Sequence, residues 1–242
     1  MTADPLAAAD RETVALVGAP NVGKSVVFNA LADEYVDVSN YPGTTVETTL
    51  AEMGSFALTD TPGVYGISSF DEEERITRDI VLAADRAINV VDATHLDRDL
   101  FLTLQLLDMG IPTVVCLNIM DEAAAAGIEV DPDALEAALG VPVVPTVAVN
   151  GEGLDEIPER LPEADAPEDP PIADHFEALP KDLEANRRER TLLVEGDEAT
   201  AQRVADRSPS VADGGTPAFV EPERRDAGYG HRRDRVGRIV DQ

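Results

Sequence analysis

The sequence predicts an α/β fold: a mostly parallel β-sheet with helices on both faces, followed by a small helical domain. Short apolar runs alternate with helical patterns over the first two thirds of the chain, and one strand–helix junction carries a phosphate-binding pattern. The alternation stops near residue 161, where proline and acidic residues accumulate. Continuous apolar strands separated by helices are typical of parallel sheets buried on both faces.

The first predicted strand is TVALVG (13–18), and a helical pattern follows from Lys24 to about Asp33. Because ligands of doubly wound sheets bind at the carboxyl ends of the strands, each strand end is a candidate for function. A turn at Met53 and Gly54 joins two strand-like runs, 46–53 and 55–60. The later apolar runs and helical stretches are, in order, AINVVD (87–92), 97–109, TVVCLN (113–118), 132–139, VPVVPT (141–146) and 153–161.

The chain divides by composition into a first domain (1–161), a linker rich in proline and acid (162–174), and a helical regulatory domain (175–242). Within the last part, 175–205 looks helical, 208–219 reads as a loop, and 222–240 is a final helix candidate. This tail is sparsely hydrophobic, so we expect it to pack on another part of the molecule.

The 242 residues include 48 Asp and Glu against 19 Lys and Arg, a net charge of −29. Such a surface repels nucleic-acid backbones and anionic lipids, so a nucleic-acid partner is not expected. No run approaches the roughly 20 apolar residues that span a bilayer, and the N-terminus lacks a signal-peptide pattern. The single cysteine, Cys116, suits a reducing cytosol, and we expect a cytoplasmic location.

Residues 18–25, GAPNVGKS, match the phosphate-binding pattern G-x-x-x-x-G-K-[ST]. In that pattern the glycines let backbone N–H groups point at phosphate oxygens. Lys24 would contact the β- and γ-phosphates, and the Ser25 hydroxyl can ligate Mg²⁺. The stretch lies between a predicted strand and a predicted helix, as that mechanism requires.

DTPG (60–63) ends the next strand but one and predicts a metal and γ-phosphate contact. Asp60 is placed to hold the Mg²⁺ shell, and Gly63 can offer its N–H to a phosphate because glycine permits close backbone approach. The alternative is a plain Pro-Gly turn. Its position after the phosphate-binding loop favours the functional interpretation.

NIMD (118–121) fits Asn-x-x-Asp, a guanine-reading pattern, at the end of TVVCLN. An ionised Asp121 accepts two N–H bonds from guanine, whereas adenine would leave the carboxylate unpaired. The alternative is helix capping by Asp121. Between DTPG and the phosphate loop, SNYPGTTVE (39–47) offers a threonine for Mg²⁺, and position alone leaves Thr44 and Thr45 ambiguous.

These four stretches occur in the order of the Ras-like P-loop GTPases. Three stretches closely resemble the cytosolic GTPase domain of the ferrous iron transport protein B (FeoB) family. They are NYPGTTVE (40–47), 62–81 and 88–123. The resemblance covers about residues 12–160. The tail resembles, more weakly, that family's helical domain, and AGYGHRRDRVGRIVDQ (227–242) is similar to its last helix before the membrane.

The resemblance implies Ser25, Thr45 and Asp60 as Mg²⁺ ligands, with Thr45 in a first switch loop that closes on GTP. A second switch would begin at Asp60 and Gly63. Lys24, Asn21, Thr45 and Gly63 would serve hydrolysis. The implied GTP site comprises Gly18, Ala19, Pro20, Asn21, Val22, Gly23, Lys24, Ser25, Val26, Gly43, Thr44, Thr45, Asp60, Thr61, Pro62, Gly63, Asn118, Ile119, Met120, Asp121, Thr146, Val147 and Ala148.

Two departures from the family pattern accompany that assignment. The last base loop, PTVAVNGEG (145–153), has Val147-Ala148 where the family usually carries Ser-Ala, and the Ala148 N–H would contact the guanine O6. DTPG replaces the commoner Asp-Leu-Pro-Gly, a change of little consequence.

In this class of GTPases an asparagine at the position of Asn21 is associated with a K⁺ ion beside the phosphates. That ion supplies the positive charge that an arginine finger supplies in other GTPases. The alternative is a turn-forming asparagine. Val64 follows DTPG, so no glutamine there positions the attacking water. We therefore expect slow intrinsic hydrolysis, and no side-chain base is identified.

Other residues carry weaker signals. His95, His175 and His231 are far apart in sequence without metal-ligand spacing, so surface positions are favoured. Cys116 is expected to be an inert core thiol. The clusters RRER (187–190) and RRDR (232–235) could face a membrane or an acidic partner, but a solvated helix face is favoured.

The main hypothesis is a GTP-hydrolysing regulatory module for ferrous iron uptake, whose tail relays the switch change to a membrane-embedded iron channel. That channel would belong to the same protein or to a separate chain, and a homo-oligomer is compatible with the sequence. One alternative is a free-standing GTPase of the ribosome- or tRNA-associated (Era/TrmE) kind, which the acidic charge disfavours. Another is a nucleotide-binding scaffold with little turnover.

The acidic composition also predicts a halophilic source, because dense carboxylates keep a protein hydrated when salt screens charge repulsion. The alternative is simply a soluble acidic protein. We expect the midpoint of thermal unfolding, followed by circular dichroism, to rise between low salt and molar KCl. Equal stability without salt would contradict the halophilic interpretation.

Overall fold

The computed structural model describes residues 11–41, 44–68, 71–168, 172–177, 179–207 and 222–241. The described elements are β1 (Glu12–Gly18), α1 (Lys24–Leu31), β2 (Glu34–Asn40), β3 (Glu47–Met53), β4 (Phe56–Asp60), α2 (Glu72–Ala83), β5 (Arg86–Asp92), α3 (Leu96–Asp108), β6 (Thr113–Asn118), α4 (Met120–Ala125), α5 (Pro132–Leu139), β7 (Val143–Pro145), α6 (Glu156–Arg160), α7 (Ala173–Phe176), α8 (Arg187–Val194), α9 (Glu198–Arg207) and α10 (Pro222–Val240).

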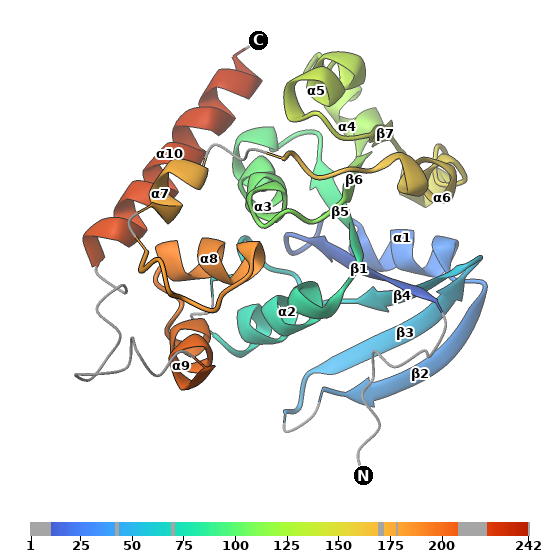
Figure 1. The fold of residues 1–242 in the computed structure, drawn as a ribbon. Helices are drawn as coiled ribbons and strands as arrows, with labels where there is room; N and C mark the ends of the chain where they lie inside the picture. Colours follow the sequence, from blue (N-terminus) through green and yellow to red (C-terminus); the bar gives the residue numbers. More distant parts are fainter. Residues whose placement is uncertain are drawn as a thin grey trace.

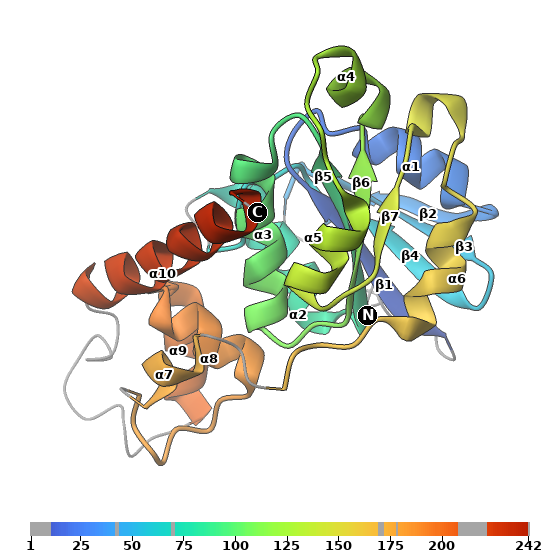
Figure 2. The same ribbon diagram turned by 90° about the horizontal axis from the view of Figure 1, so that it is seen from above.

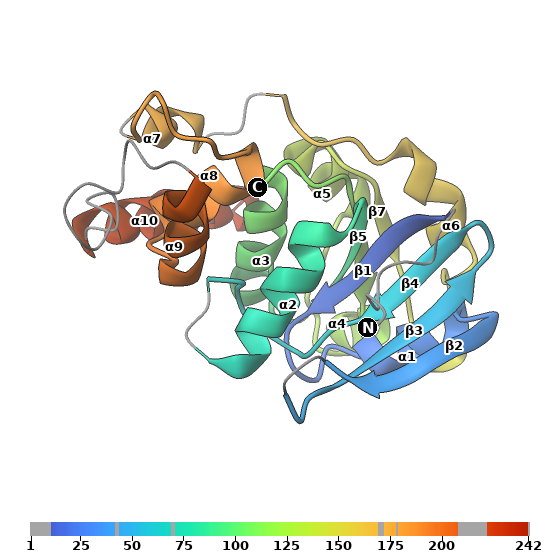
Figure 3. The ribbon, with the colours of Figure 1, turned by 60° about the horizontal axis from the view of Figure 1, so that its bottom comes forward.

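One seven-stranded sheet organises the fold, with strand order β2-β3-β4-β1-β5-β6-β7. The pairs β1–β4, β1–β5, β5–β6 and β6–β7 are parallel, and β2 and β3 add an antiparallel edge. This edge lies far from the helical tail (Figure 3). The predicted α/β class with a mostly parallel sheet is confirmed.

Alternate side chains of β1 enter two separate cores, as strand geometry requires. Val14 and Leu16 pack with Val27 and Phe28 of α1, and with Ile157 of α6. Their neighbours Ala15 and Val17 pack on the opposite face with α2 and α3. Figure 2 shows α1 and α6 on one side of the sheet and α2 and α3 on the other. Both faces are covered, which explains the continuous apolar runs.

Three described elements, β2, α2 and α4, were not predicted. The side chains of β2 that the structure describes are exposed, Tyr35, Val36 and Val38 among them, and its apolar run is short. Helix α2 begins with three glutamates after Asp71, whose carboxylate accepts a hydrogen bond from the Glu74 N–H at 2.8 Å. This is a recognisable helix start, with acidic residues placed favourably near the N-terminus.

The stretch 175–205, predicted to be helical, is largely helical but not continuous. It is divided into α7, α8 and α9, with a non-helical stretch that includes Pro180. A proline interrupts helical hydrogen bonding, and Asn186 then starts α8 with a reciprocal capping box to Glu189. The predicted final helix matches α10, and the predicted loop at 208–219 lies outside the described residues.

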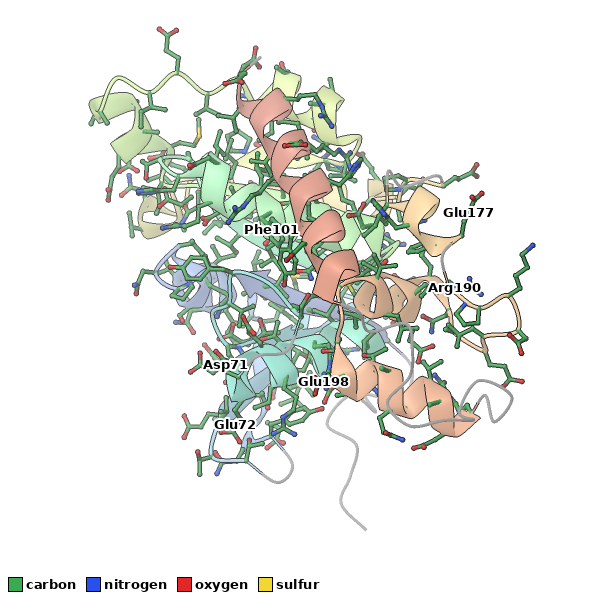
Figure 4. The ribbon with its side chains drawn as sticks, turned by 90° about the vertical axis from the view of Figure 1, so that its left-hand side faces the viewer. Asp71, Glu72, Phe101, Glu177, Arg190 and Glu198 are labelled. Carbon is green, nitrogen blue, oxygen red and sulfur yellow. The ribbon has the colours of Figure 1, made fainter. Side chains whose placement is uncertain are left out.

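The tail packs on the α/β domain, as its sparse hydrophobicity predicts (Figure 1). Leu192 of α8 joins the core beneath α2 and α3, and Val236 of α10 joins Leu100 and Leu104 of α3. In Figure 4, Phe101 of α3 lies beside α10, where its ring stacks on Tyr229 at a centroid distance of 5.3 Å. Among the described helices, none is both long and apolar enough to cross a membrane.

The solvated face predicted for the arginine clusters is wrong for three of these residues. Arg187 donates to the carbonyls of Asp108 at 2.9 Å and Leu107 at 2.8 Å. Arg188 donates to Leu82 O at 2.9 Å, and Arg232 is only 1 % exposed. Because arginine has several donors in a rigid fork, it can bind several carbonyls at a helix end. These arginines attach the tail to the α/β domain.

Arg187→Ala tests that attachment. The substitution removes the charged donor shared by two carbonyls at the end of α3, so we expect a loss of about 1–3 kcal/mol in the free energy of unfolding. The measurement is urea unfolding followed by circular dichroism. Arg75→Ala is the matched control, because its ion pair with Glu72 is half exposed and should change stability by less than about 0.5 kcal/mol. Equal effects of the two variants would contradict the assignment.

Candidate functional site

The predicted site residues gather at one edge of the sheet. Gly18, Asp60 and Asn118 end β1, β4 and β6, and Thr146 follows β7. These strands run parallel to one another, so their carboxyl ends lie at the same edge. The topology therefore brings together motifs that are up to about 130 residues apart in sequence.

The phosphate-binding loop surrounds a cavity of about 440 Å³. Gly23 precedes α1 with φ of 89°, a left-handed conformation that favours glycine, and no side chain caps the first N–H groups of the helix. These N–H groups and the positive end of α1 suit an anion. The cavity is lined by Ala19, Pro20, Asn21, Gly23, Lys24, Ser25, Val26, Gly63 and Glu73.

Lys24 is held between the loop and β4. Its Nζ lies 3.1 Å from Asp60 Oδ1 and also donates to the Thr61 carbonyl. The Thr61 hydroxyl in turn donates to Leu16 O at 2.9 Å, which fixes the end of β4 against β1. The lysine, which lines the cavity, is thus paired with a carboxylate beside it, and both side chains are partly buried. A bound phosphate would take the place of Asp60 as the partner of Lys24. A divalent cation would take the place of Lys24 as the partner of Asp60.

Asn21 lies in the phosphate-binding loop, and Gly63, which follows β4, packs against that loop. Asn21 has φ of 66°, so its backbone supports the turn-forming interpretation, since asparagine tolerates this conformation. Gly63 packs so closely on the loop that an added Cβ would lie 3.0 Å from the Pro20 Cα. Val64 N–H donates to Gly18 O at 3.1 Å. The segment after DTPG is therefore bound directly to the phosphate-binding loop.

Asn118 joins the phosphate-binding loop to the last base loop. Its Nδ2 donates to Val22 O at 2.9 Å. Its Oδ1 accepts from the Ala148 N–H at 3.0 Å and from the Thr146 hydroxyl at 3.2 Å. The side chain is 3 % exposed, so these bonds are shielded from water.

This arrangement bears on the role predicted for Ala148. Its N–H, expected on the guanine O6, is already bound to Asn118. The next N–H belongs to Val149, which is 77 % exposed, and no hydrogen-bond partner for it is found among the described residues. The backbone contact with the guanine O6 therefore stays a prediction.

The turn after Asn118 is strained. Ile119 has φ of 66°, which is unusual for a β-branched residue, and α4 begins immediately afterwards. Such strain persists where the surroundings fix it, commonly at ligand sites. The turn places Asp121 in the first turn of α4 with its side chain exposed, and Met120 N–H bonds to Thr146 O at 3.4 Å.

The first predicted switch is only partly described, because Gly43 lies outside the described residues. Thr44 Oγ1 donates to Tyr41 O at 2.9 Å and accepts from Val46 N–H at 3.2 Å. Thr45 is exposed, and its hydroxyl has no partner among the described residues. The two threonines, which the sequence left as alternative Mg²⁺ ligands, therefore differ in the structure. The Thr44 hydroxyl is hydrogen-bonded within its own loop, whereas the Thr45 side chain is exposed.

Sequence reasoning missed Glu73. This residue lies in the first turn of α2 and lines the phosphate-loop cavity, although it is 48 residues beyond Ser25. The signal was the run DEEER (71–75) at the start of an amphipathic helix, within the second predicted switch that runs from Asp60 towards Arg78.

The histidines and Cys116 have structural settings. The described residues contain no group of three or more His, Cys, Asp or Glu that could hold a metal ion. His95 is exposed, but His175 and His231 are not far apart in space, because α7 and α10 bring their rings to 5.9 Å between centroids. Cys116 is fully buried in β6, 3.3 Å from the Thr146 hydroxyl.

Comparisons with known proteins agree with this fold. The family model for ferrous iron transport protein B matches residues 12–161. The chain is 42 % identical over 158 residues to an Fe(2+) transport protein A/Fe(2+) transporter FeoB fusion protein of Porphyromonas gingivalis, covering 61 % of this chain and 18 % of that protein. The chain spans about one fifth of the length of the curated relatives it matches.

Two solved structures resemble the whole chain. The cytosolic domain of FeoB from L. pneumophila is 30 % identical with a TM-score of 0.78, covering 95 % of this chain and 98 % of that one. The NFeoB protein of S. thermophilus bound to GDP·AlF4⁻ and K⁺ is 28 % identical with a TM-score of 0.74, covering 96 % of this chain and all of that one.

The reactivity of Cys116, the single thiol, tests whether reagents in solution reach β6 beneath the predicted base loop. Burial raises the pKa of Cys116 to about 12, so only about one molecule in ten thousand carries the thiolate at pH 8. We expect no reaction with Ellman's reagent at pH 8 in the folded protein and one equivalent after unfolding in guanidinium chloride. Rapid labelling of the folded protein would contradict this burial.

Proposed function

The chain belongs to the ferrous iron transport protein B family, and on that premise we propose that it is a GTP-hydrolysing regulatory module of a ferrous iron transporter. One observation carries the proposal: the sheet brings the phosphate-binding loop, Asp60 and the Asn118–Asp121 turn to one edge. Phosphate, metal and guanine contacts are thereby available from a single site.

The guanine end of the site is assigned to Asp121 and the base loop. An exposed carboxylate at the start of α4 can accept two N–H bonds from guanine, while Asn118 holds the surrounding loops. The Val149 N–H, in place of Ala148, is available for the guanine O6. The backbone contact therefore does not depend on the serine that this chain lacks.

The phosphate end fits a Mg²⁺–nucleotide pair. Ser25 and Thr45 supply hydroxyl oxygens and Asp60 a carboxylate, which are the hard ligands that Mg²⁺ prefers. When bound, the ion would neutralise charge that develops on the phosphates. Lys24 would leave its bond to Asp60 and bind the β- and γ-phosphates, and the Gly63 N–H would hold the γ-phosphate.

Asn21 is proposed to bind K⁺ through its carboxamide oxygen, beside the phosphates. It lines the phosphate cavity with its side chain exposed, and the related S. thermophilus protein was crystallised with K⁺. No glutamine follows Gly63, so intrinsic turnover is proposed to be slow, with the cation supplying part of the charge stabilisation.

In the transporter, hydrolysis would release both switches, and the tail would carry the change to a membrane-embedded iron channel. The family relationship supports this role at the cytoplasmic face of the membrane. The comparisons give no support to the ribosome- or tRNA-associated alternative. Gel filtration of the purified chain would show whether it forms a homo-oligomer.

Asp121→Asn tests the guanine assignment and with it the proposed function. Asparagine can donate to the extra oxygen of xanthine but cannot accept the two guanine N–H bonds. We expect preference to shift from GTP to xanthosine triphosphate by at least about 100-fold in kcat/KM, since each lost charge-assisted bond costs about 1.5–3 kcal/mol. The measurement is phosphate release with each nucleotide. An unchanged preference would remove the guanine assignment.

GTP turnover in KCl and in NaCl tests the role of Asn21. We expect faster phosphate release in KCl for the wild-type protein, and equal slow rates in both salts for Asn21→Ala. Asn21→Gly is the matched control for the backbone, because glycine adopts the same positive φ without supplying an oxygen. If wild-type rates are equal in both salts, the K⁺ assignment fails.

A further inference from the structure

Two of the three histidines meet in the helical tail, outside the proposed nucleotide site. His175 belongs to α7 and His231 to α10. Their ring centroids lie 5.9 Å apart, and the ring planes are inclined at 76° to each other. The proposed GTP chemistry uses neither side chain, so the meeting of these two rings needs a separate explanation.

The ring of His175 lies on the inner side of α7. Ile172, which precedes the helix, is 1 % exposed, and Phe176 packs on the same apolar cluster, formed with α8 and α9. Residues three and four apart share one face of a helix, so His175 lies on the face that these two residues turn toward the body of the tail. The His175 side chain is accordingly half-buried.

His231 lies on the part of α10 that is fixed to the rest of the protein. The next residue, Arg232, is 1 % exposed and is paired with Asp108 and Glu195. One turn further on, Val236 packs in the core with α3. The backbone of α10 is therefore held in place beside His231. The Nε2 atom of His231 is buried and has no hydrogen-bond partner among the described residues.

This unpartnered nitrogen is the observation that points to a ligand. Buried polar atoms of folded proteins nearly always have a partner, and an exception calls for a specific explanation, such as a bound ion. A neutral imidazole has one nitrogen with a free lone pair, and imidazole is the commonest protein ligand of transition metals. Because a second imidazole touches the first, two such ligands are present at one place.

The spacing of the two rings suits a shared metal ion. A Zn–N bond is about 2.0–2.1 Å long, so the centres of two rings that share an ion lie about 5–6.5 Å apart. The observed 5.9 Å lies within that range. The rings meet edge to face, and the χ2 torsion of histidine is soft. A rotation of the half-buried His175 ring would therefore aim a nitrogen of each ring at one point.

The local charge does not oppose a cation. The neighbouring guanidinium of Arg232 is neutralised by Asp108 and Glu195, and the chain as a whole carries a net charge of −29. No group of three or more His, Cys, Asp or Glu that could hold a metal is found among the described residues, so water would complete the coordination shell. Such an open site differs from the closed four-ligand sites of structural zinc.

We propose that His175 and His231 form a binding site for one divalent transition-metal ion, of the series from Fe²⁺ to Zn²⁺, with water as the remaining ligands. Mg²⁺ is disfavoured there because it prefers oxygen ligands. The ion would join α7, at the start of the tail, to α10, at its end. The inference goes beyond the proposed function and does not rest on it, since neither histidine belongs to the proposed GTP site.

Titration with Co²⁺ tests the proposal, because Co²⁺ stays divalent in air and stands next to Fe²⁺ in the order of affinities. The nucleotide-free chain is titrated at about pH 7.5, where imidazole is ordinarily neutral. Molar KCl and millimolar Mg²⁺ are present, so that salt and Mg²⁺ compete for the surface carboxylates. Binding is followed by proton NMR of the histidine rings, because paramagnetic Co²⁺ shifts the resonances of its own ligands.

His175→Ala and His231→Ala each remove one ligand. His95→Ala is the matched control, because His95 is exposed and is paired with Asp92 instead. We expect the wild type and His95→Ala to bind one Co²⁺ through the other two rings. Each ligand variant should bind Co²⁺ at least about tenfold more weakly, since even the partners of metal ligands contribute that much. If His231→Ala fails to fold, His175→Ala decides alone.

Thermal unfolding followed by circular dichroism supplies a second readout. Co²⁺ in excess over its dissociation constant should raise the unfolding midpoint of the wild type and of His95→Ala by at least about 3 °C, because an ion bound only to the folded state stabilises it. The same concentration should leave His175→Ala unchanged. Equal affinity of the wild type and His175→Ala, or a Co²⁺ shift confined to the His95 ring, overturns the inference and leaves the proposed function standing.

Discussion

The side chain of Asn118 is the point on which the site depends. A single buried carboxamide binds the phosphate loop at Val22 through its donor, and the base loop at Thr146 and Ala148 through its acceptor. Asparagine carries both kinds of group in one short side chain. An aspartate could not donate, and a longer glutamine would not fit where Gly23 lies against the amide. The two halves of the site are thus fixed by one residue before any ligand arrives.

Around this point, polar groups that carry no catalytic chemistry do most of the positioning. Thr61 is bonded to β1, and Gly153 approaches Pro145 O so closely that an added Cβ would lie 2.3 Å away. Each contact fixes backbone rather than side chain. This is consistent with a site whose main work is to place N–H groups around phosphates and a base.

Arginine has a second role in this acidic protein. Burial lowers the pKa of Arg188, yet a guanidinium stays charged at neutral pH, and Arg187 and Arg188 bind carbonyls at the ends of α3 and α2. Arg232 is enclosed by Asp108 and Glu195, whose charges raise its pKa against the opposing effect of burial. The tail is therefore attached by directed bonds as well as by apolar contact, and these bonds end on elements that border the site.

The sequence by itself determined the parallel sheet, the ends of most strands and the three motifs at those ends, because each depends on local pattern: apolar runs, glycine at a turn, and fixed spacing. Tertiary structure alone decided three further points. It paired the Ala148 N–H with Asn118 and brought Glu73 into the phosphate cavity. It also buried arginines for which the sequence predicted a solvated helix face. Each of these depends on which distant group meets a donor or carboxylate in space, and spacing along the chain does not encode that.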